Sequence, residues 1–386
     1  KKTYRFLNLF VICLGMKFKI SRSDFFRTLS HLQGIVDKKN SLPILANILI
    51  EAQDNKLILS STDMDISLVE QIKCNVLENG STTINSQIIY DIVRKLDDNS
   101  DIELISNNGK LLTLRSVGSR FSLACLPKED YPLINKDTQN SDIIINSKTL
   151  HKLIDKTKFA ISNEETRYFL NGLYFNVTNE NNKNIVTLVG TDGHRLAKFS
   201  HEIQGKIEQF PGVIIPKKTI YELSKLLSDI DKDIKISISS NKIVFIIDDI
   251  VFTSKLIDGS FPDYKRVIPN DNVNVLKINR YNLLSAVDRV STIANEKSPV
   301  IKFKLLQNIL NLNTINNESS TASEDLKIDY NGDEIEIGFN SKYIMDIVNN
   351  LEDDEISIYL KDNTSPIIAQ ENSKTNLVYV LMPMRV

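Results

Sequence analysis

The chain has 386 residues, a length typical of two or three domains. Hydrophobic residues make up 41% and no run reaches 18 apolar residues, which is typical of a globular protein and excludes a membrane-spanning helix. The formal net charge of -2 excludes a protein that is basic throughout, but it leaves room for a local basic patch. Cys13, Cys74 and Cys125 make neither a disulfide framework nor a cluster of metal ligands. We therefore expect a cytoplasmic protein with no membrane partner, metal or cofactor.

The first fifteen residues differ from the rest of the chain. Basic residues precede an apolar stretch over 6–14, an order that is similar to a secretory signal. No pair of small residues marks a cleavage site after it, and Met16 opens a segment in which polar and apolar residues alternate. We predict that 1–15 is an upstream extension and that Met16 is the true start. A signal peptide is the alternative.

From Met16 onward the chain repeats one plan three times. Each copy has a short strand that leads into an amphipathic helix, then a second helix that runs through an acidic turn into an alternating strand. Phe25, Leu150 and Leu283 occupy the same register in the three copies. The predicted helices are 21–36, 86–96, 147–161, 216–228, 279–293 and 341–352.

The offset between copies is about 125 to 133 residues, which is far longer than a solenoid period. We therefore predict three similar domains at 16–140, 141–268 and 269–386. Short strands, such as those at 185–192 and 242–248, outnumber the helices, so each domain is predicted to be α+β, with two helices on an antiparallel sheet. The stretch 313–325, rich in Asn, Ser and Glu, is predicted to be an exposed loop or a poorly formed hairpin.

Charge is divided unequally between the helices and the rest of the chain. The six predicted helices contain 14 Lys and Arg against 7 Asp and Glu, whereas the remainder has a net charge of -9. If these helices share one face, that face attracts phosphate. Solvated helix surfaces also often hold lysine, so this imbalance alone leaves both interpretations open.

Several segments resemble one family. They are T-D-G-H-R-L at Thr191–Leu196, F-T-S-K-L at Phe252–Leu256 followed by F-P-D-Y-K-R at Phe261–Arg266, and Y-V-L-M-P-M-R at Tyr379–Arg385. Together with R-Y-F-L-N-G at Arg167–Gly172 and L-P-I-L at Leu42–Leu45, they make the sequence closely similar to the bacterial DNA sliding clamps, the beta subunits of DNA polymerase III. The resemblance extends from Met16 to Val386.

The resemblance implies a non-enzymatic processivity factor. Two copies would form a head-to-tail homodimer, a ring whose helices line a hole around duplex DNA without reading its sequence. Twelve helices at roughly 9 Å spacing would give a diameter of about 35 Å between helix axes, wide enough for a duplex. The implied protein partners are the catalytic subunit of the replicative polymerase, the clamp loader, other polymerases, ligase and mismatch-repair proteins.

A non-specific DNA contact needs Lys and Arg on the helices. The candidate DNA-facing residues are Arg22, Arg27, Lys39, Arg94, Lys148, Lys152, Lys156, Lys217, Lys218, Arg280 and Arg289. The resemblance also places Lys39 and the loop 163–167 near the DNA, although Glu164 and Glu165 weaken a phosphate role for two positions of that loop.

The resemblance further implies a pocket between the second and third domains. In the family it takes a short partner peptide with a Gln and apolar anchors, and apolar side chains with flexible methionines suit that task. The matching residues are Leu170, Thr191, Gly193, His194, Arg195, Leu196, Pro262, Arg266, Val267, Val380, Leu381, Met382, Pro383, Met384 and Arg385. The three arginines in this set could hydrogen-bond peptide carbonyls or acidic flanks.

Phe121, Thr292 and Ile293 match family positions at the subunit interface, and core packing is the alternative for Phe121. Two other functions stay open. A monomeric scaffold would use the peptide pocket without encircling DNA. A hydrolase would use Asp192 and His194, although no nucleophile motif accompanies that pair.

Overall fold

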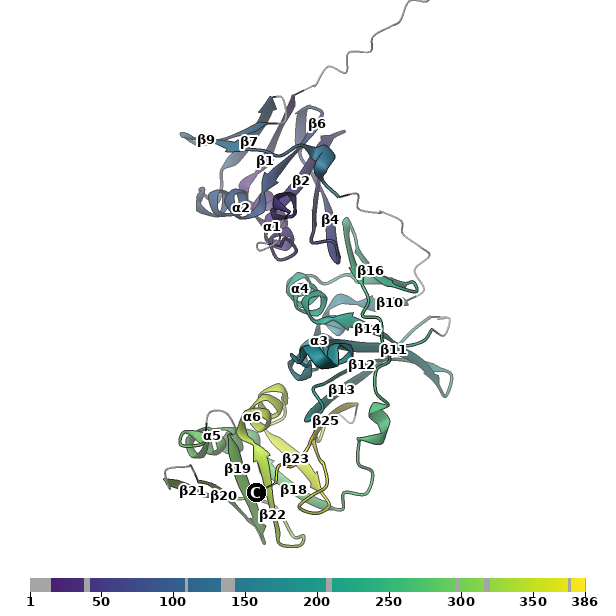
Figure 1. The fold of residues 1–386 in the computed structure, drawn as a ribbon, viewed down its shortest axis with the longest axis vertical. Helices are drawn as coiled ribbons and strands as arrows, with labels where there is room; N and C mark the ends of the chain where they lie inside the picture. The colour runs from purple at the N-terminus through teal and green to yellow at the C-terminus, as the bar shows by residue number, and fades with distance from the viewer. Residues whose placement is uncertain are drawn as a thin grey trace, which may run out of the picture. The chain divides into compact units, whose positions relative to one another are not determined.

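The computed structural model describes residues 15–37, 42–107, 110–132, 143–205, 210–295, 299–315, 320–373 and 376–385. The chain divides into two compact units. Figure 1 labels their helices and strands. The first takes the described residues of Lys1–Ser141 together with Lys232–Lys255, and the second takes those of Asp142–Asp231 and Leu256–Val386. Within these ranges no helix is both long and apolar enough to cross a membrane.

The first unit has two antiparallel sheets and two helices. Its helices are α1 (Arg22–Gln33) and α2 (Ser86–Lys95), with short 3-10 turns η1 (Pro43–Ala46) and η2 (Lys128–Asp130). Its strands are β1 (Met16–Ser21), β2 (Asn47–Gln53), β3 (Lys56–Thr62), β4 (Ile66–Lys73), β5 (Asn75–Glu78), β6 (Gly80–Asn85), β7 (Asp101–Asn107), β8 (Leu111–Ser116), β9 (Ser119–Ala124), β15 (Asp233–Ile238), β16 (Lys242–Ile247) and β17 (Ile250–Lys255). One sheet has the order β5-β1-β7-β8-β9, and the other contains β15-β16-β17-β4-β3-β2-β6.

The second unit follows the same plan twice. Its helices are α3 (Ser147–Asp155), α4 (Lys217–Leu227), α5 (Arg280–Ser291) and α6 (Ser341–Asn350), with 3-10 turns η3 (Lys158–Ala160), η4 (Glu165–Leu170) and η5 (Tyr264–Arg266). Its strands are β10 (Ile143–Asn146), β11 (Gly172–Glu180), β12 (Lys183–Thr191), β13 (Arg195–Ile203), β14 (Val213–Pro216), β18 (Asn274–Asn279), β19 (Val300–Leu306), β20 (Ile309–Ile315), β21 (Thr321–Lys327), β22 (Ile335–Asn340), β23 (Glu355–Leu360), β24 (Ile367–Glu371) and β25 (Leu377–Leu381). Its sheets have the orders β14-β11-β12-β13-β25-β24-β23-β18 and β21-β20-β19-β22.

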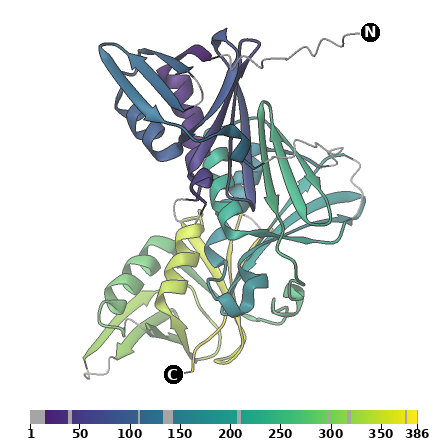
Figure 2. The same ribbon diagram turned by 45° about the horizontal axis from the view of Figure 1, so that its top comes forward.

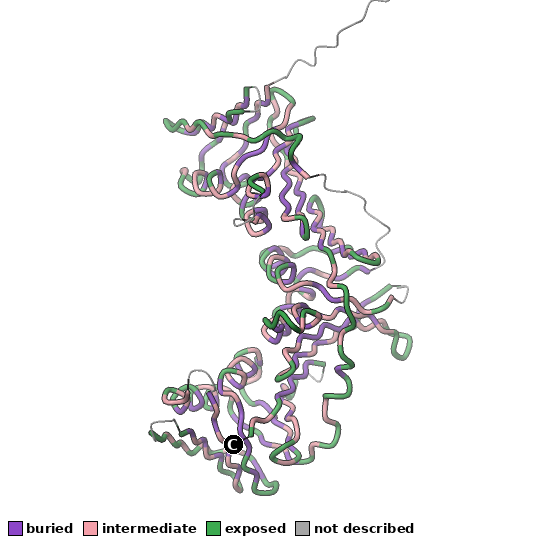
Figure 3. The backbone as a smooth tube through the Cα atoms, viewed as in Figure 1, coloured by how far each residue is buried: buried purple, intermediate pink, exposed green. Residues whose placement is uncertain are grey.

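Each helix pair packs side by side: α1 with α2, α3 with α4, and α5 with α6 (Figures 1 and 2). The apolar residues that share a register, Phe25, Leu150 and Leu283, are at most 1% exposed. Buried and accessible residues alternate along many strands, such as β7 and β20, whereas β25 is buried throughout. Figure 3 colours the backbone by this burial. The predicted α+β repeats, with two helices on antiparallel sheet, are therefore confirmed.

Asparagine and serine set where most of these helices begin. The side chain of the residue before the first turn accepts a backbone N–H of that turn at Ser21, Asn85, Asn146, Asn279 and Asn340. Such a cap satisfies one of the donors that a helix N-terminus leaves unpaired. This strand–cap–helix junction recurs in all three repeats, whereas α4 begins after Pro216 without a side-chain cap.

One predicted helix ends early, and one stretch takes the second of its two predicted forms. The helix predicted over 147–161 ends at Asp155, because the Thr157 hydroxyl bonds back to the Leu153 carbonyl at 2.7 Å and the chain tightens into η3. Of the two forms predicted for 313–325, the structure supports the hairpin, since β21 pairs antiparallel with β20 from Thr321 to Lys327. The sequence of β21 contains few apolar residues. Polar contacts hold this strand instead, such as that of Glu324 with Arg289.

Candidate partner-binding surface and basic helices

A strand pair brings two of the family-like motifs together. In the β13–β25 ladder, Arg195 lies opposite Leu381 and Leu196 opposite Val380. The ladder continues past the strand, since the Met382 N–H donates to the His194 carbonyl at 2.9 Å. The turn before β13 and the C-terminal segment are therefore neighbours within the second unit.

The turn is built around the Asp192 carboxylate. One of its oxygens accepts the backbone N–H of His194 at 2.9 Å and that of Arg195 at 3.0 Å. Its other oxygen accepts Nε of Arg195 at 3.1 Å. Gly193 completes the turn with φ of 86°, a conformation that favours glycine. Asp192 thus holds the turn and does not orient the His194 imidazole, which argues against the hydrolase alternative.

The Arg195 guanidinium, predicted to hydrogen-bond a bound peptide, binds groups within the chain in this structure. Besides Asp192, its guanidinium donates to the Asp346 carboxylate on α6 at 2.5 Å and to the Phe159 carbonyl at 2.9 Å. Its side chain is only 10% exposed. Nε and both terminal nitrogens therefore already have partners within the chain.

The segment after β17 packs beside the same strands. Tyr264 belongs to a buried cluster with Val189, Leu196 and Val380, against which Phe261 also packs. Burial raises the pKa of the Tyr264 hydroxyl, which stays neutral near pH 7. This packing anchors the segment on the sheet and leaves Pro262, Arg266 and Val267 exposed.

The predicted pocket residues divide into two groups by exposure. Leu170, Leu196, Val380 and Leu381 are at most 3% exposed, so they are core residues. The accessible ones, which we call the partner surface, are Thr191, Gly193, His194, Pro262, Arg266, Val267, Met382, Pro383, Met384 and Arg385. Met382 is 37% exposed, which makes it an apolar side chain that a ligand can cover.

Sequence reasoning missed the residues that support this surface. Tyr343 on α6 stacks on the His194 ring with 6.3 Å between centroids, and it lies in the third repeat. Arg167, assigned to a DNA-facing loop, binds Glu164 at 2.8 and 2.6 Å and lies over Gly193. Only the polar Asp346 on an amphipathic helix could have hinted at this support from the sequence.

The candidate DNA-facing residues are not equivalent. Arg22 is buried and donates to the carbonyls of Val93 at 2.9 Å and Arg94 at 2.7 Å, so it joins α1 to the end of α2. Lys156 is also buried and donates to the Asn350 carbonyl at 2.6 Å. Both arrangements contradict a DNA-facing role, and we remove these two residues from the set.

The remaining helix cations are more accessible. Arg27, Arg94, Lys148 and Arg289 have side chains that are 53% to 69% exposed, and each is paired with a nearby carboxylate. Lys152 is 44% exposed and binds Glu352 at 3.0 Å. Lys217 binds Asn163, Lys218 is exposed, and Arg280 lies 4.2 Å from the centroid of the Tyr281 ring. Lys39 lies outside the described residues.

The residues assigned to a subunit interface lie at element edges. Phe121 is half-buried on β9, the edge strand of its sheet. Thr292 caps the end of α5 and donates to the Asp288 carbonyl at 3.2 Å, and Ile293 follows it half-buried.

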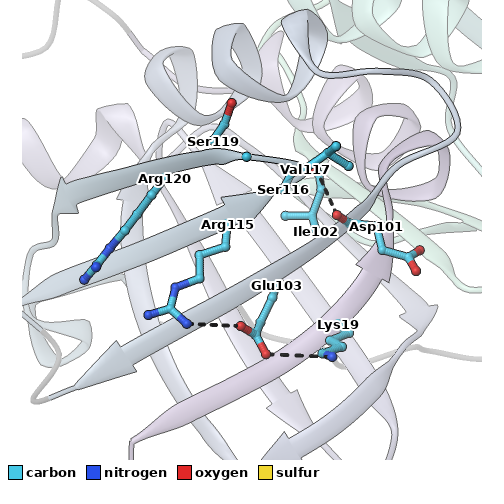
Figure 4. Close-up of a pocket in the computed structure, with 10 residues that line it drawn as sticks. Lys19, Asp101, Ile102, Glu103, Arg115, Ser116, Val117, Ser119 and Arg120 are labelled. Carbon is cyan, nitrogen blue, oxygen red and sulfur yellow. Dashed lines mark hydrogen bonds and ion pairs between the residues drawn. The ribbon is translucent and has the colours of Figure 1, made fainter.

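A cavity of about 430 Å³ lies on the face of β1, β7, β8 and β9, and we call it basic because three cations against two carboxylates line it (Figure 4). In it Glu103 lies between Lys19 at 3.9 Å and Arg115 at 3.7 Å, while Arg115 faces Arg120 across the ladder. Two arginines in directly opposed positions repel each other unless a negative group lies near them.

Comparisons with known proteins cover almost the whole chain. Family models of the DNA polymerase III beta subunit match at 16–135 (N-terminal domain), 144–263 (central domain) and 265–385 (C-terminal domain). The beta sliding clamp of Caulobacter vibrioides is 38% identical over 372 residues, which cover 96% of this chain and 100% of that protein.

Solved structures agree with this. The crystal structure of a sliding clamp from Bartonella birtlesii bound to griselimycin has a TM-score of 0.93 and 41% identity, and the match covers 96% of this chain and 100% of that one. A Pseudomonas aeruginosa sliding clamp, also bound to griselimycin, has a TM-score of 0.90 and 31% identity, with the same coverage.

Proposed function

Because the chain belongs to the family of DNA polymerase III beta subunits, the bacterial sliding clamps, we propose that two copies close head to tail into a ring around duplex DNA. A beta subunit is a non-catalytic processivity subunit of the polymerase, and this chain has that function. The match of all three family domains, in order and over nearly the full chain, is the observation that carries the conclusion.

The exposed helix cations support sliding on DNA in the cytoplasm. Arg27, Arg94 and Lys148 are accessible, and their partners are exposed carboxylates that hold them only weakly. Long flexible cations attract phosphate without regard to sequence, and each neutralised phosphate makes binding weaker as salt rises. Such contacts keep a ring centred on DNA without fixing it in one place.

Two sheet edges support closure of the ring. The edge strand β9 carries Arg120 beside the basic cavity, whereas the edge strand β21 of the other unit carries Glu324 and Asp325. A head-to-tail contact joins two different surfaces, so opposite charges on them favour it over a contact between like edges. We propose that β9 of one copy meets β21 of the next, with Phe121, Thr292 and Ile293 in the contact.

The partner surface supports tethering. We propose that the catalytic subunit of the polymerase, the clamp loader, other polymerases, ligase and mismatch-repair proteins insert apolar anchor residues beside Met382 and Met384. We propose that griselimycin, which is bound to two related clamps, also binds this surface, and we choose it as the probe.

Retention on DNA tests the ring. The protein is loaded on a nicked circular plasmid by a clamp loader with ATP, and retention is measured before and after the plasmid is linearised. Encirclement predicts loss on linearisation, because the ring slides off the ends. Equal retention on both forms would mean that the protein binds by contact, and the monomeric scaffold would replace the clamp.

A further inference from the structure

Arg195 connects the second and third repeats within the second unit through its hydrogen bonds. Its guanidinium donates to Asp192 in the turn at 3.1 Å, to Asp346 on α6 at 2.5 Å and to the carbonyl of Phe159 in η3 at 2.9 Å. Those partners come from three elements and from both repeats. Charge-assisted hydrogen bonds of a planar guanidinium fix its orientation as well as its position.

Aromatic rings hold the same guanidinium. Its central carbon lies 4.4 Å from the centroid of Tyr343 and 5.2 Å from that of Phe159. Tyr343 stacks in turn on His194, an exposed member of the partner surface. Burial and the Asp192 carboxylate raise the pKa of the Tyr343 hydroxyl, so this ring is neutral near pH 7. Helix α6 therefore supplies both the carboxylate that binds Arg195 and the ring that supports His194.

We propose that Arg195 is a positioning residue: held by Asp346, it sets the 191–194 turn against α6 and so determines how tightly the partner surface binds its ligands. This inference rests on the proposed function of that surface. It differs from direct recognition, in which Arg195 would donate to the bound peptide, because the structure already gives its side-chain nitrogens partners within the chain.

The test is a double-mutant cycle with griselimycin as the probe, its affinity measured by calorimetry. Asp346→Ala should weaken binding about tenfold, and Arg195→Ala should weaken it at least as much. The double variant should bind no more weakly than Arg195→Ala alone, because both substitutions remove the same contact between Arg195 and Asp346. Additive losses, or unchanged affinity in Asp346→Ala, would overturn the proposal.

Controls separate positioning from general loosening. Lys156→Met breaks a different tie between α3 and the end of α6, so it should lower the melting temperature and leave griselimycin affinity unchanged. Asp288→Ala removes an exposed acid from α5 and should change neither the melting temperature nor the griselimycin affinity. Asp346→Glu should restore part of the affinity, since it keeps the carboxylate.

Hydrogen exchange gives a readout without ligand. In Asp346→Ala the amides of 192–195 should exchange faster, because the turn has lost its tie to α6. Faster exchange with unchanged griselimycin affinity would make this contact purely structural and refute the proposal. Asp346→Ala and Arg195→Ala should load less well, because the clamp loader is proposed to use the same surface, but the half-life of loaded protein on the circular plasmid should equal that of the wild type. Failure of the clamp function is recognised separately, by loss of retention in the wild type.

Discussion

Met382 and Met384 are the apolar side chains of the partner surface that leave β25 and stay accessible. Their backbones are fixed, since the Met382 N–H binds His194 at 2.9 Å and the Met384 N–H binds the Gly338 carbonyl at 2.8 Å. Each unbranched side chain can then adapt to different ligands on a stable base.

Replacing both methionines by alanine should therefore abolish ligand binding without unfolding the surface. Full burial of one such side chain contributes about 1.5–3 kcal/mol, so the pair should cost griselimycin at least a hundredfold in affinity, measured by calorimetry. The dimer mass in light scattering should not change. A variant that became monomeric would show that these methionines are structural.

Tyr379 joins the second and third repeats through its hydroxyl. It donates to the Lys156 carbonyl at 3.1 Å, and its ring packs edge-on against Phe159. Burial, and then the carboxylates of Glu371, Glu352 and Asp155, raise its pKa above the ordinary value of 10.0. Below pH 10 the folded and unfolded chains both keep this proton. Above it only the unfolded chain loses the proton, so the stability that Tyr379 contributes falls as pH rises.

Tyr379→Phe should accordingly lower the free energy of unfolding by about 1 kcal/mol at pH 8, because one hydrogen bond is lost. Its stability should also fall less steeply than that of the wild type between pH 8 and 10.5. Urea titrations at several pH values measure both effects. Parallel pH profiles of the two proteins would mean that the hydroxyl does not titrate differently on folding.

Residue types were easier to predict than residue partners. The sequence motifs identified Arg195, Arg22 and Lys156 as important cations, yet all three bind groups inside the chain. The sequence pattern around a helix cation is the same whether its side chain faces DNA or binds a carbonyl at the end of a distant helix. Only tertiary packing decides between these roles: that of α1 on α2 for Arg22, and that of α6 on the second repeat for Lys156 and Arg195.

At the scale of elements, periodicity predicted the helices well because their apolar faces repeat in register. Their ends depended on side-chain bonds that periodicity does not contain, as the early end of α3 at Asp155 shows. The β20–β21 pair was predicted only as one of two alternatives, for a related reason. Its outer strand has few apolar residues and relies on polar contacts such as Arg289 with Glu324.

The end of α3 leads to a prediction about its lysines. Lys148 and Lys152 have exposed side chains, whereas Lys156 is bound to Asn350 and Glu352. Lys148→Glu with Lys152→Glu should shorten retention on the nicked plasmid, most clearly at low salt, with little change in melting temperature. Lys156→Glu should lower stability by about 3–5 kcal/mol, because it leaves a buried carboxylate unpaired beside another one.

Two strand lysines provide the matched control. Lys235 on β15 and Lys277 on β18 are exposed, so Lys235→Glu with Lys277→Glu makes the same change in net charge away from the helices. Their retention should equal that of the wild type. Equal losses in both double variants would indicate that net charge alone, and not the helix surface, governs retention.

At the scale of the whole molecule, strands of different sequence repeats pair within one sheet. Strand β17 of the second repeat pairs with β4 of the first, and β13 of the second pairs with β25 of the third. Internal repeats predicted three similar domains but not these pairings, because strands more than 170 residues apart leave no local signal. The partner surface depends on one of them, so its residues could be named from the family motifs while its geometry could not.

The same logic extends between copies. Phe121 lies on the edge strand β9, and Ile293 follows the end of α5. Both side chains are half-buried, which is typical of side chains that a second copy covers. Phe121→Ala with Ile293→Ala should weaken the dimer at least tenfold, since each buried apolar side chain contributes about 1.5–3 kcal/mol. Light scattering at micromolar concentration measures the mass. Val273→Ala, which trims an apolar side chain that is 78% exposed, should leave it unchanged.

The double variant Phe121→Ala with Ile293→Ala, once monomeric, then distinguishes the function of the ring from that of the partner surface. Griselimycin should bind it as tightly as the wild type, because the surface lies within one unit of one chain. Its retention on the nicked plasmid should be lost, because an open chain cannot be held by topology and its exposed cations bind DNA only weakly in salt. A mass that stayed dimeric would remove Phe121 and Ile293 from the interface. A monomer that was still retained on circular DNA would show that contact, and not encirclement, holds this protein on its template.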